Sequence, residues 1–144
     1  IRPCPRGVGP AIGARRDRFI NLRARKPQRR SAHRLAERQP VEVEVPFETP
    51  LGPLTLRGRI DAVFADDDGG VTVVDWKTGR PPRGDEAQIR AVQLSAYRIA
   101  YARWRGLDPA RVRGAFFHAA TGETTRPRLL DEDEVVRLLG EVVA

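Results

Sequence analysis

The stretch Val-Thr-Val-Val-Asp-Trp-Lys-Thr-Gly at residues 71–79 places charged side chains at the end of a short apolar run. Three valines within four residues favour a β-strand, and the Thr-Gly that follows favours a turn. Because neighbouring side chains in a strand point to opposite faces, Asp75 and Lys77 share one face while Val74 and Trp76 share the other. A carboxylate and an ammonium group therefore lie side by side at the end of a predicted strand.

Two further strands are predicted upstream of this one. Residues 54–64 form the nearer strand, whose apolar side chains share one parity: Leu54, Leu56, Ile60, Ala62 and Phe64. Residues 41–48 form the other, with a second apolar series: Val41, Val43, Val45 and Phe47. The Asp-Asp-Asp-Gly-Gly sequence at 66–70 predicts a hairpin loop. Three strands joined by short links imply an antiparallel meander.

The rest of the chain alternates between helix and strand. A helix is predicted over 86–104, with apolar residues at three- and four-residue steps: Ile89, Val92, Ala96, Ile99 and Ala100. A strand over 112–118, a short edge strand over 124–128 and a closing helix over 132–143 follow. This order predicts an α/β or α+β fold, a mixed sheet with an antiparallel meander flanked by helices.

The positive charge of the chain is concentrated at its beginning. Of the net +7, residues 1–40 carry 12 Lys+Arg and 2 Asp+Glu, a net of +10, whereas residues 41–144 carry 14 and 17, a net of −3. The first segment is rich in Pro, Gly and Arg, so we predict a poorly ordered segment over 1–40, with a short helical turn near 16–25, and one folded domain over 41–144. A basic segment of this kind can bind the phosphate backbone of a nucleic acid, although a solvated terminus without a ligand has the same composition.

The composition indicates in which cellular compartment the protein is expected. The chain has 144 residues, starts at Ile1 and lacks methionine, so we expect it to be a piece of a longer polypeptide. The single cysteine, Cys4, excludes an internal disulfide, and no apolar run reaches the ~18 residues of a membrane span. We therefore expect a cytoplasmic protein without a membrane partner.

Two carboxylates are predicted to meet in this sheet. If the strand over 54–64 pairs with the strand over 71–77, Asp61 lies near Asp75, and their mutual repulsion calls for a proton or a divalent cation between them. Hard oxygen ligands suit Mg²⁺ or Mn²⁺. A metal held in this way and a nearby Lys77 favour hydrolysis of a phosphodiester. Gln93 and Tyr97, four residues apart on the predicted helix, can line the adjoining wall.

These residues resemble a known family. Gly-x-Ile-Asp at 58–61, Asp-Trp-Lys-Thr-Gly at 75–79 and Gln-Leu-x-x-Tyr at 93–97 look like the motifs of the RecB-type branch of the PD-(D/E)XK nucleases, with greatest likeness to the C-terminal nuclease domain of actinobacterial UvrD-like helicases. The resemblance implies a restriction-endonuclease-like core, Asp61 and Asp75 as metal ligands, and catalytic roles for Lys77, Gln93 and Tyr97.

One feature of that family is missing. Its members usually add a metal-binding histidine from an upstream helix, and His33 is the only upstream histidine here, in a context that does not favour a ligand. Either that helix has been lost from this piece, or the fragment is inactive by itself. The lone Cys4 also excludes the four-cysteine iron–sulfur cluster of some relatives.

Two functions follow as expectations. The first is a Mg²⁺-dependent DNA nuclease, an exonuclease-type hydrolase in DNA repair that acts on single-stranded ends beside an ATP-binding helicase motor on the same chain or a partner subunit. The second is a catalytically incomplete module of the same fold that binds or guides single-stranded DNA in a helicase complex.

Overall fold

The structure is a computed structural model that describes residues 19–22, 35 and 38–143. Its elements in chain order are β1 (Phe19–Leu22), β2 (Glu42–Leu51), β3 (Leu54–Ala65), β4 (Val71–Lys77), α1 (Asp85–Arg105), a 3₁₀ turn (Pro109–Arg111), β5 (Val112–His118), β6 (Glu123–Thr125) and α2 (Glu132–Val143). Every strand and helix predicted after residue 40 is present, with small shifts at the ends. The mixed sheet flanked by helices is confirmed.

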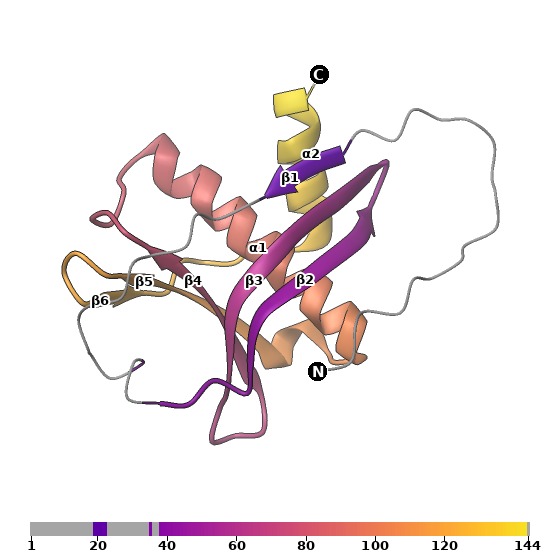
Figure 1. Cartoon of the computed structure of the whole chain (residues 1–144). Helices are drawn as coiled ribbons and strands as arrows, with labels where there is room; N and C mark the ends of the chain where they lie inside the picture. The colour runs from indigo at the N-terminus through magenta and orange to yellow at the C-terminus, as the bar shows by residue number, and fades with distance from the viewer. Residues whose placement is uncertain (1–18, 23–34, 36–37, 144) are drawn as a thin grey trace.

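The sheet has three antiparallel pairings and two parallel ones among the described strands. Strands β2, β3 and β4 form the predicted antiparallel meander, and β6 pairs antiparallel with β5. Strand β5 runs parallel to β4, because α1 carries the chain back along the sheet between them (Figure 1). Strand β1 pairs parallel with residues 55–58 of β3, so residues 19–22 form a strand where a helical turn was expected. The division of the chain at residue 40 stays a prediction.

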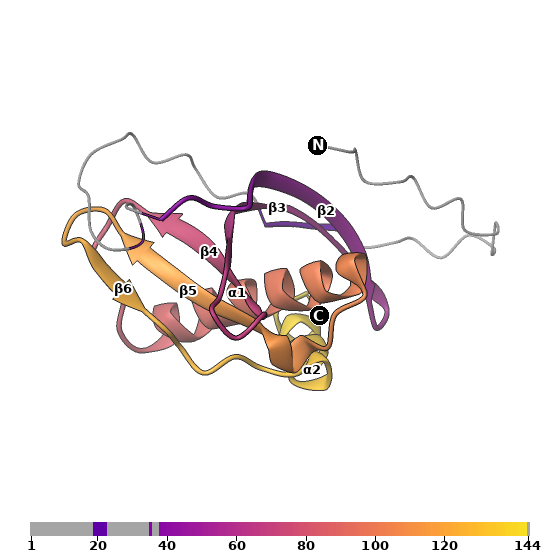
Figure 2. The ribbon, with the colours of Figure 1, turned by 90° about the horizontal axis from the view of Figure 1, so that it is seen from below.

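Both helices pack on the same face of the sheet (Figure 2). The larger core lies there and includes apolar residues of all the strands from β2 to β5 and of both helices, among them Leu56, Val73, Leu94, Phe116 and Val135. A smaller cluster lies on the other face and joins Leu35 to Ala62, Phe64, Val74, Ala115 and Phe117. Within the residues that the structure describes, no helix is long and apolar enough to cross a membrane.

Strand β2 changes face at Glu44. This residue has a φ of 50°, which interrupts the regular alternation of side chains. Beyond it Val45 and Phe47 are buried as predicted, but Val41 and Val43 are 56% and 49% exposed. The prediction that all four apolar residues share one buried face is therefore wrong for the first two, because the positive φ rotates the strand between them and the rest.

Strand β3 changes face at the matching position. Its register pairs Val43 with Ala62 and Val45 with Ile60, so Glu44 lies across from Asp61. Ile60 belongs to the core under the helices, whereas Ala62 and Phe64 belong to the cluster on the opposite face. The apolar residues of β3 that were predicted to share one face of the strand therefore lie on two opposite faces. Asp61 lies at the position where the strand turns over.

Helix α1 is confirmed but buries a different stripe from the predicted one. Val92, Ala96, Ile99 and Ala100 are buried as expected, but Ile89 is 67% exposed. The first turn of the helix is largely exposed as well. The helix ends at Gly106, whose left-handed conformation directs its N–H to the carbonyl of Arg103.

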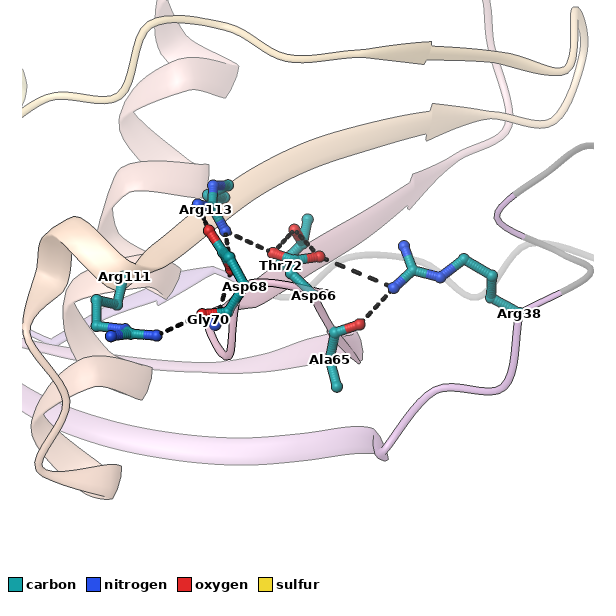
Figure 3. Close-up of polar contacts among 8 residues, drawn as sticks. All are labelled: Arg38, Ala65, Asp66, Asp68, Gly70, Thr72, Arg111 and Arg113. Atoms are coloured by element: carbon teal, nitrogen blue, oxygen red, sulfur yellow. Dashed lines mark hydrogen bonds and ion pairs between the residues drawn. The ribbon is translucent and has the colours of Figure 1, made fainter.

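The turn between β3 and β4 is fixed by ion pairs (Figure 3). Asp66 accepts a hydrogen bond from the Thr72 hydroxyl at 2.8 Å and pairs with Arg113 at 2.9 Å. Asp68 accepts from the N–H of Gly70 at 2.9 Å and also contacts Arg113. The carbonyls of this corner accept further hydrogen bonds from Arg38 and Arg111. These contacts hold the hairpin that brings β3 beside β4.

Candidate active site

The candidate site lies where β3 and β4 separate. Their ladder of backbone pairs runs from Ala65 opposite Val71 to Ala62 opposite Val74 and then stops. Beyond it, the backbone N–H of Trp76 donates to Oδ2 of Asp61 at 2.9 Å. A side-chain carboxylate thus takes the place of a ladder carbonyl and is held against β4. This contact depends on the change of the buried face of β3 at Asp61.

Asp75 is fully buried on the face of β4 that carries Lys77. The Lys77 Nζ lies 2.5 Å from Oδ2 of Asp75, and its side chain is 16% exposed. Neither carboxylate oxygen of Asp75 has a hydrogen-bond partner of good geometry in the described part of the chain, so the lysine contact is an ion pair. A buried carboxylate that lacks hydrogen bonds is costly, and its oxygens remain available to another ligand.

Asp61 and Asp75 are electrostatically linked. The pKa of Asp61 is raised to about 7, chiefly by burial and further by the neighbouring carboxylate of Asp75. The N–H of Trp76 and the charge of Lys77 oppose this rise. A pair of carboxyl groups in this arrangement holds a proton at mildly acidic pH, and a cation between them would replace that proton.

Helix α1 supplies the wall of the site. Nζ of Lys77 donates to Oε1 of Gln93 at 3.2 Å, and Nε2 of Gln93 donates to the Tyr97 hydroxyl at 2.9 Å. Tyr97 is fully buried and packs edge-on against Phe47 with ring centroids 5.4 Å apart. Burial, and next the charge of Asp75, raise the pKa of Tyr97 well above its ordinary value, so its hydroxyl stays protonated.

The structure thus brings together all five residues singled out in the sequence, in one continuous chain of contacts: Asp61, Asp75, Lys77, Gln93 and Tyr97. Trp76 points away from them and packs edge-on against Phe117, with ring centroids 4.8 Å apart, as expected of a core residue. Among the described residues, no group of three or more His, Cys, Asp or Glu side chains gathers into a metal site. Cys4 and His33 lie outside the described residues.

Strand β5 supports the site in a way that the sequence did not reveal. Its parallel register places Phe116 beside Asp75 and His118 beside Lys77. Nζ of Lys77 lies 5.6 Å from the centre of the Phe116 ring, a cation–π distance. The buried His118 bonds through Nε2 to the Thr125 hydroxyl at 3.0 Å, consistent with a structural histidine, and burial lowers its pKa. No local sequence signal gives this parallel register.

Comparisons with known proteins complete the description of the site. No curated protein sequence is significantly similar to this chain. A solved structure, that of SSO0001, shares 23% identity with a TM-score of 0.45; the match covers 71% of this chain and 48% of that one, so this chain spans about half of its length. The sequence pattern of the PD-(D/E)XK nuclease superfamily matches residues 6–144. Its members are typically nucleases that use a divalent metal, usually Mg²⁺, to cleave nucleic acid. The chain belongs to the PD-(D/E)XK nuclease superfamily.

Proposed function

We propose that this protein hydrolyses DNA phosphodiester bonds with the help of Mg²⁺ or Mn²⁺. The observation that carries the proposal is the Asp61 and Asp75 pair, held together at the fork of β3 and β4 with Lys77 beside it. A surface salt bridge would not account for this arrangement, because Asp75 is fully buried and its oxygens lack hydrogen-bond donors of good geometry.

The residues present fit a divalent cation. Two carboxylates provide hard oxygen ligands, and burial beside Asp75 raises the pKa of Asp61, which supports a proton or a cation between the two groups. Mg²⁺ commonly keeps several waters and takes only one or two protein carboxylates together with phosphate oxygens. Two protein ligands are therefore enough for the proposed site, with Asp61 and Asp75 in that role.

Each remaining residue has a role that follows from its contacts. When bound, the cation supplies a water of lowered pKa and polarises the scissile phosphate. Lys77 offers its ammonium group to the charge that develops on the phosphate oxygens. Gln93 positions Lys77 by accepting a hydrogen bond from Nζ, and Tyr97 holds Gln93 through its buried hydroxyl. Tyr97 is unsuited to be a general base, because its raised pKa keeps it protonated.

We further propose a biological setting, which rests on the likeness of the three motifs to RecB-type nucleases. In it the domain processes single-stranded DNA ends, as an exonuclease, for a UvrD-like helicase motor in DNA repair or recombination. The motor lies on the same chain or on a partner subunit. A DNA substrate agrees with a cytoplasmic location, and residues 41–144 form the nuclease domain in this proposal.

A cleavage assay tests the proposed chemistry. Single-stranded DNA labelled at one end is incubated with the full chain and Mg²⁺ or Mn²⁺, and Asp75→Ala is compared with the wild type. Asp67→Ala, at an exposed position of the β3–β4 turn, is the matched control. We expect cleavage by the wild type and the control, and none by Asp75→Ala. Equal cleavage by all three proteins would show that a contaminating nuclease or another site is responsible.

A second function is favoured by a separate observation. The described residues bring two carboxylates to the site but no third acidic or histidine ligand. The chain would then be a catalytically incomplete module that binds or guides single-stranded DNA. Salt-dependent DNA binding without metal-dependent cleavage, even in the full-length protein, would support this function over the first.

A further inference from the structure

The loop between β4 and α1 directly follows the candidate site. It runs from Thr78 to Gly84 and joins the end of β4, which carries Lys77, to the first turn of α1 (Figure 1). Its sequence contains Arg80-Pro81-Pro82-Arg83, two arginines on either side of two prolines. Any nucleic-acid strand that places a phosphate beside Lys77 passes close to this loop, because only two residues separate Lys77 from Arg80.

The two arginines are exposed, whereas the prolines between them are half-buried. Neither arginine forms an ion pair with another residue of the described part of the chain. In the same part of the chain, several other arginines have acidic partners, such as Arg57 with Glu48 and Arg113 with Asp66. The charges of Arg80 and Arg83 are thus not offset within the described fold.

The prolines limit how the loop can move. A proline ring fixes φ near −65°, and the residue before a proline is also held in an extended conformation. Residues 80–83 belong to no helix or strand, and the Pro-Pro pair favours a polyproline II conformation. In that conformation residues three apart lie on the same side, about 9 Å from each other at ~3.1 Å per residue. A polyproline II segment would therefore present Arg80 and Arg83 together.

The net charge of the domain indicates that this loop is suited to a polyanionic ligand. The domain over 41–144 has a net charge of −3, which includes the two carboxylates beside Lys77. A polyanionic strand would be repelled by such a domain unless cations lie along its path. Arginine is suited to phosphate because its guanidinium donates two parallel hydrogen bonds.

We propose that Arg80 and Arg83 bind two backbone phosphates of the DNA strand that enters the site, and that Pro81 and Pro82 hold them in place. This inference rests on the proposed function, because it takes the same DNA strand as the ligand. The contacts carry no base sequence information, so the loop positions the strand without selecting a sequence.

The test is single-stranded oligonucleotide binding by the full chain in EDTA, at several salt concentrations. Each phosphate contact on a single strand contributes about 0.7 to the slope of log K against log salt. Arg80→Gln/Arg83→Gln is therefore expected to lower the slope by about 1.4. With equal affinity at 1 M salt as the reference, binding weakens about 70-fold at 50 mM and about tenfold at 200 mM. The segment over 1–40 is the same in every variant, so its contribution cancels in the comparison.

The matched control removes the same charge elsewhere. Arg105→Gln/Arg137→Gln changes two exposed arginines, one at the end of α1 that is opposite to the loop and one on α2. We expect its salt slope to match that of the wild type. Pro81→Gly/Pro82→Gly keeps both charges, so it should leave the slope unchanged and weaken binding several-fold through lost preorganisation. Circular dichroism confirms that each variant is folded.

The outcomes separate this inference from the proposed function. Equal slopes for Arg80→Gln/Arg83→Gln and the control would overturn the role of the loop, whether or not the wild type cleaves DNA. A slope reduced only in Arg80→Gln/Arg83→Gln, in a protein that does not cleave with Mg²⁺, would support the loop and refute hydrolysis. A wild type that neither binds nor cleaves DNA would refute both.

Discussion

Replacing Asp61 with asparagine should stabilise the protein in the absence of divalent cations. An asparagine oxygen can still accept the hydrogen bond from the N–H of Trp76, and its amide can donate to Asp75 as a protonated Asp61 would. The substitution therefore keeps the shape and the hydrogen bonds of the site but removes the second negative charge. The same change should abolish cleavage, because the proposed cation loses one of its two carboxylates.

The size of the effect follows from the pKa of Asp61. Its rise from 3.8 to about 7 means that the unfolded chain loses this proton at lower pH than the folded one. The ionised site therefore destabilises the fold progressively from about pH 4 to about pH 7, and fully above that range. At 1.36 kcal/mol per pKa unit the shift corresponds to about 4 kcal/mol, and we take half of it, about 2 kcal/mol, because Asp61 keeps some contact with solvent.

Urea unfolding in EDTA at pH 8.5 and pH 4.5 measures this difference. Asp61→Asn should exceed the wild type in free energy of unfolding by about 2 kcal/mol at pH 8.5 and by about 0.5 kcal/mol at pH 4.5, where the wild-type carboxyl is still protonated in the fold. The exposed Asp67→Asn is the control and should show no such pH dependence. A variant that is less stable than the wild type at both pH values, or equally stabilised at both, would refute the raised pKa of Asp61.

Three further outcomes are expected. Lys77→Met should lower kcat for DNA cleavage by about 10²- to 10³-fold with little change in KM, because the ammonium group acts on charge that develops in the transition state. Arg113→Gln should lose less stability than the wild type between pH 4 and pH 2 in acid unfolding followed by circular dichroism, because Arg113 is the main reason that the pKa of Asp68 is lowered to about 2. Gly114→Ala should destabilise the fold by about 1–3 kcal/mol in urea, because the added Cβ would lie 2.9 Å from Cγ of the buried Leu94.

The local sequence was sufficient for most of the elements. Strand β4 has β-branched residues that end at a Thr-Gly turn, and α1 has a long series of helix-forming residues that ends at Gly106, so both were predicted at nearly their observed bounds. Strand β1 was missed. Its four residues lie in a Pro-, Gly- and Arg-rich region, and its pairing with β3 is a long-range contact that no local pattern reports.

The candidate site was predicted as a set of residues but not as a geometry. Alternation along β4 was enough to place Asp75 and Lys77 together, and a step of four residues placed Gln93 and Tyr97 on one face of α1. The sequence did not show that the carboxylate of Asp61 takes over a ladder hydrogen bond from Trp76. It also did not show that Phe116 lies beneath Lys77, because the parallel register depends on how α1 crosses the sheet.

The sequence by itself determined the order of the strands and helices, the family motifs, and which charged side chains share one face of a strand or helix. These properties depend on periods of two and of about four residues, which are local. Only the tertiary structure decided at which residues the alternation of buried and exposed side chains is interrupted. The positive φ of Glu44 and the turn-over of β3 opposite it expose Val43 and direct Asp61 toward Asp75. Such a reversal depends on the backbone conformation of a single residue within a pair of strands, and the period of two along one strand does not report it.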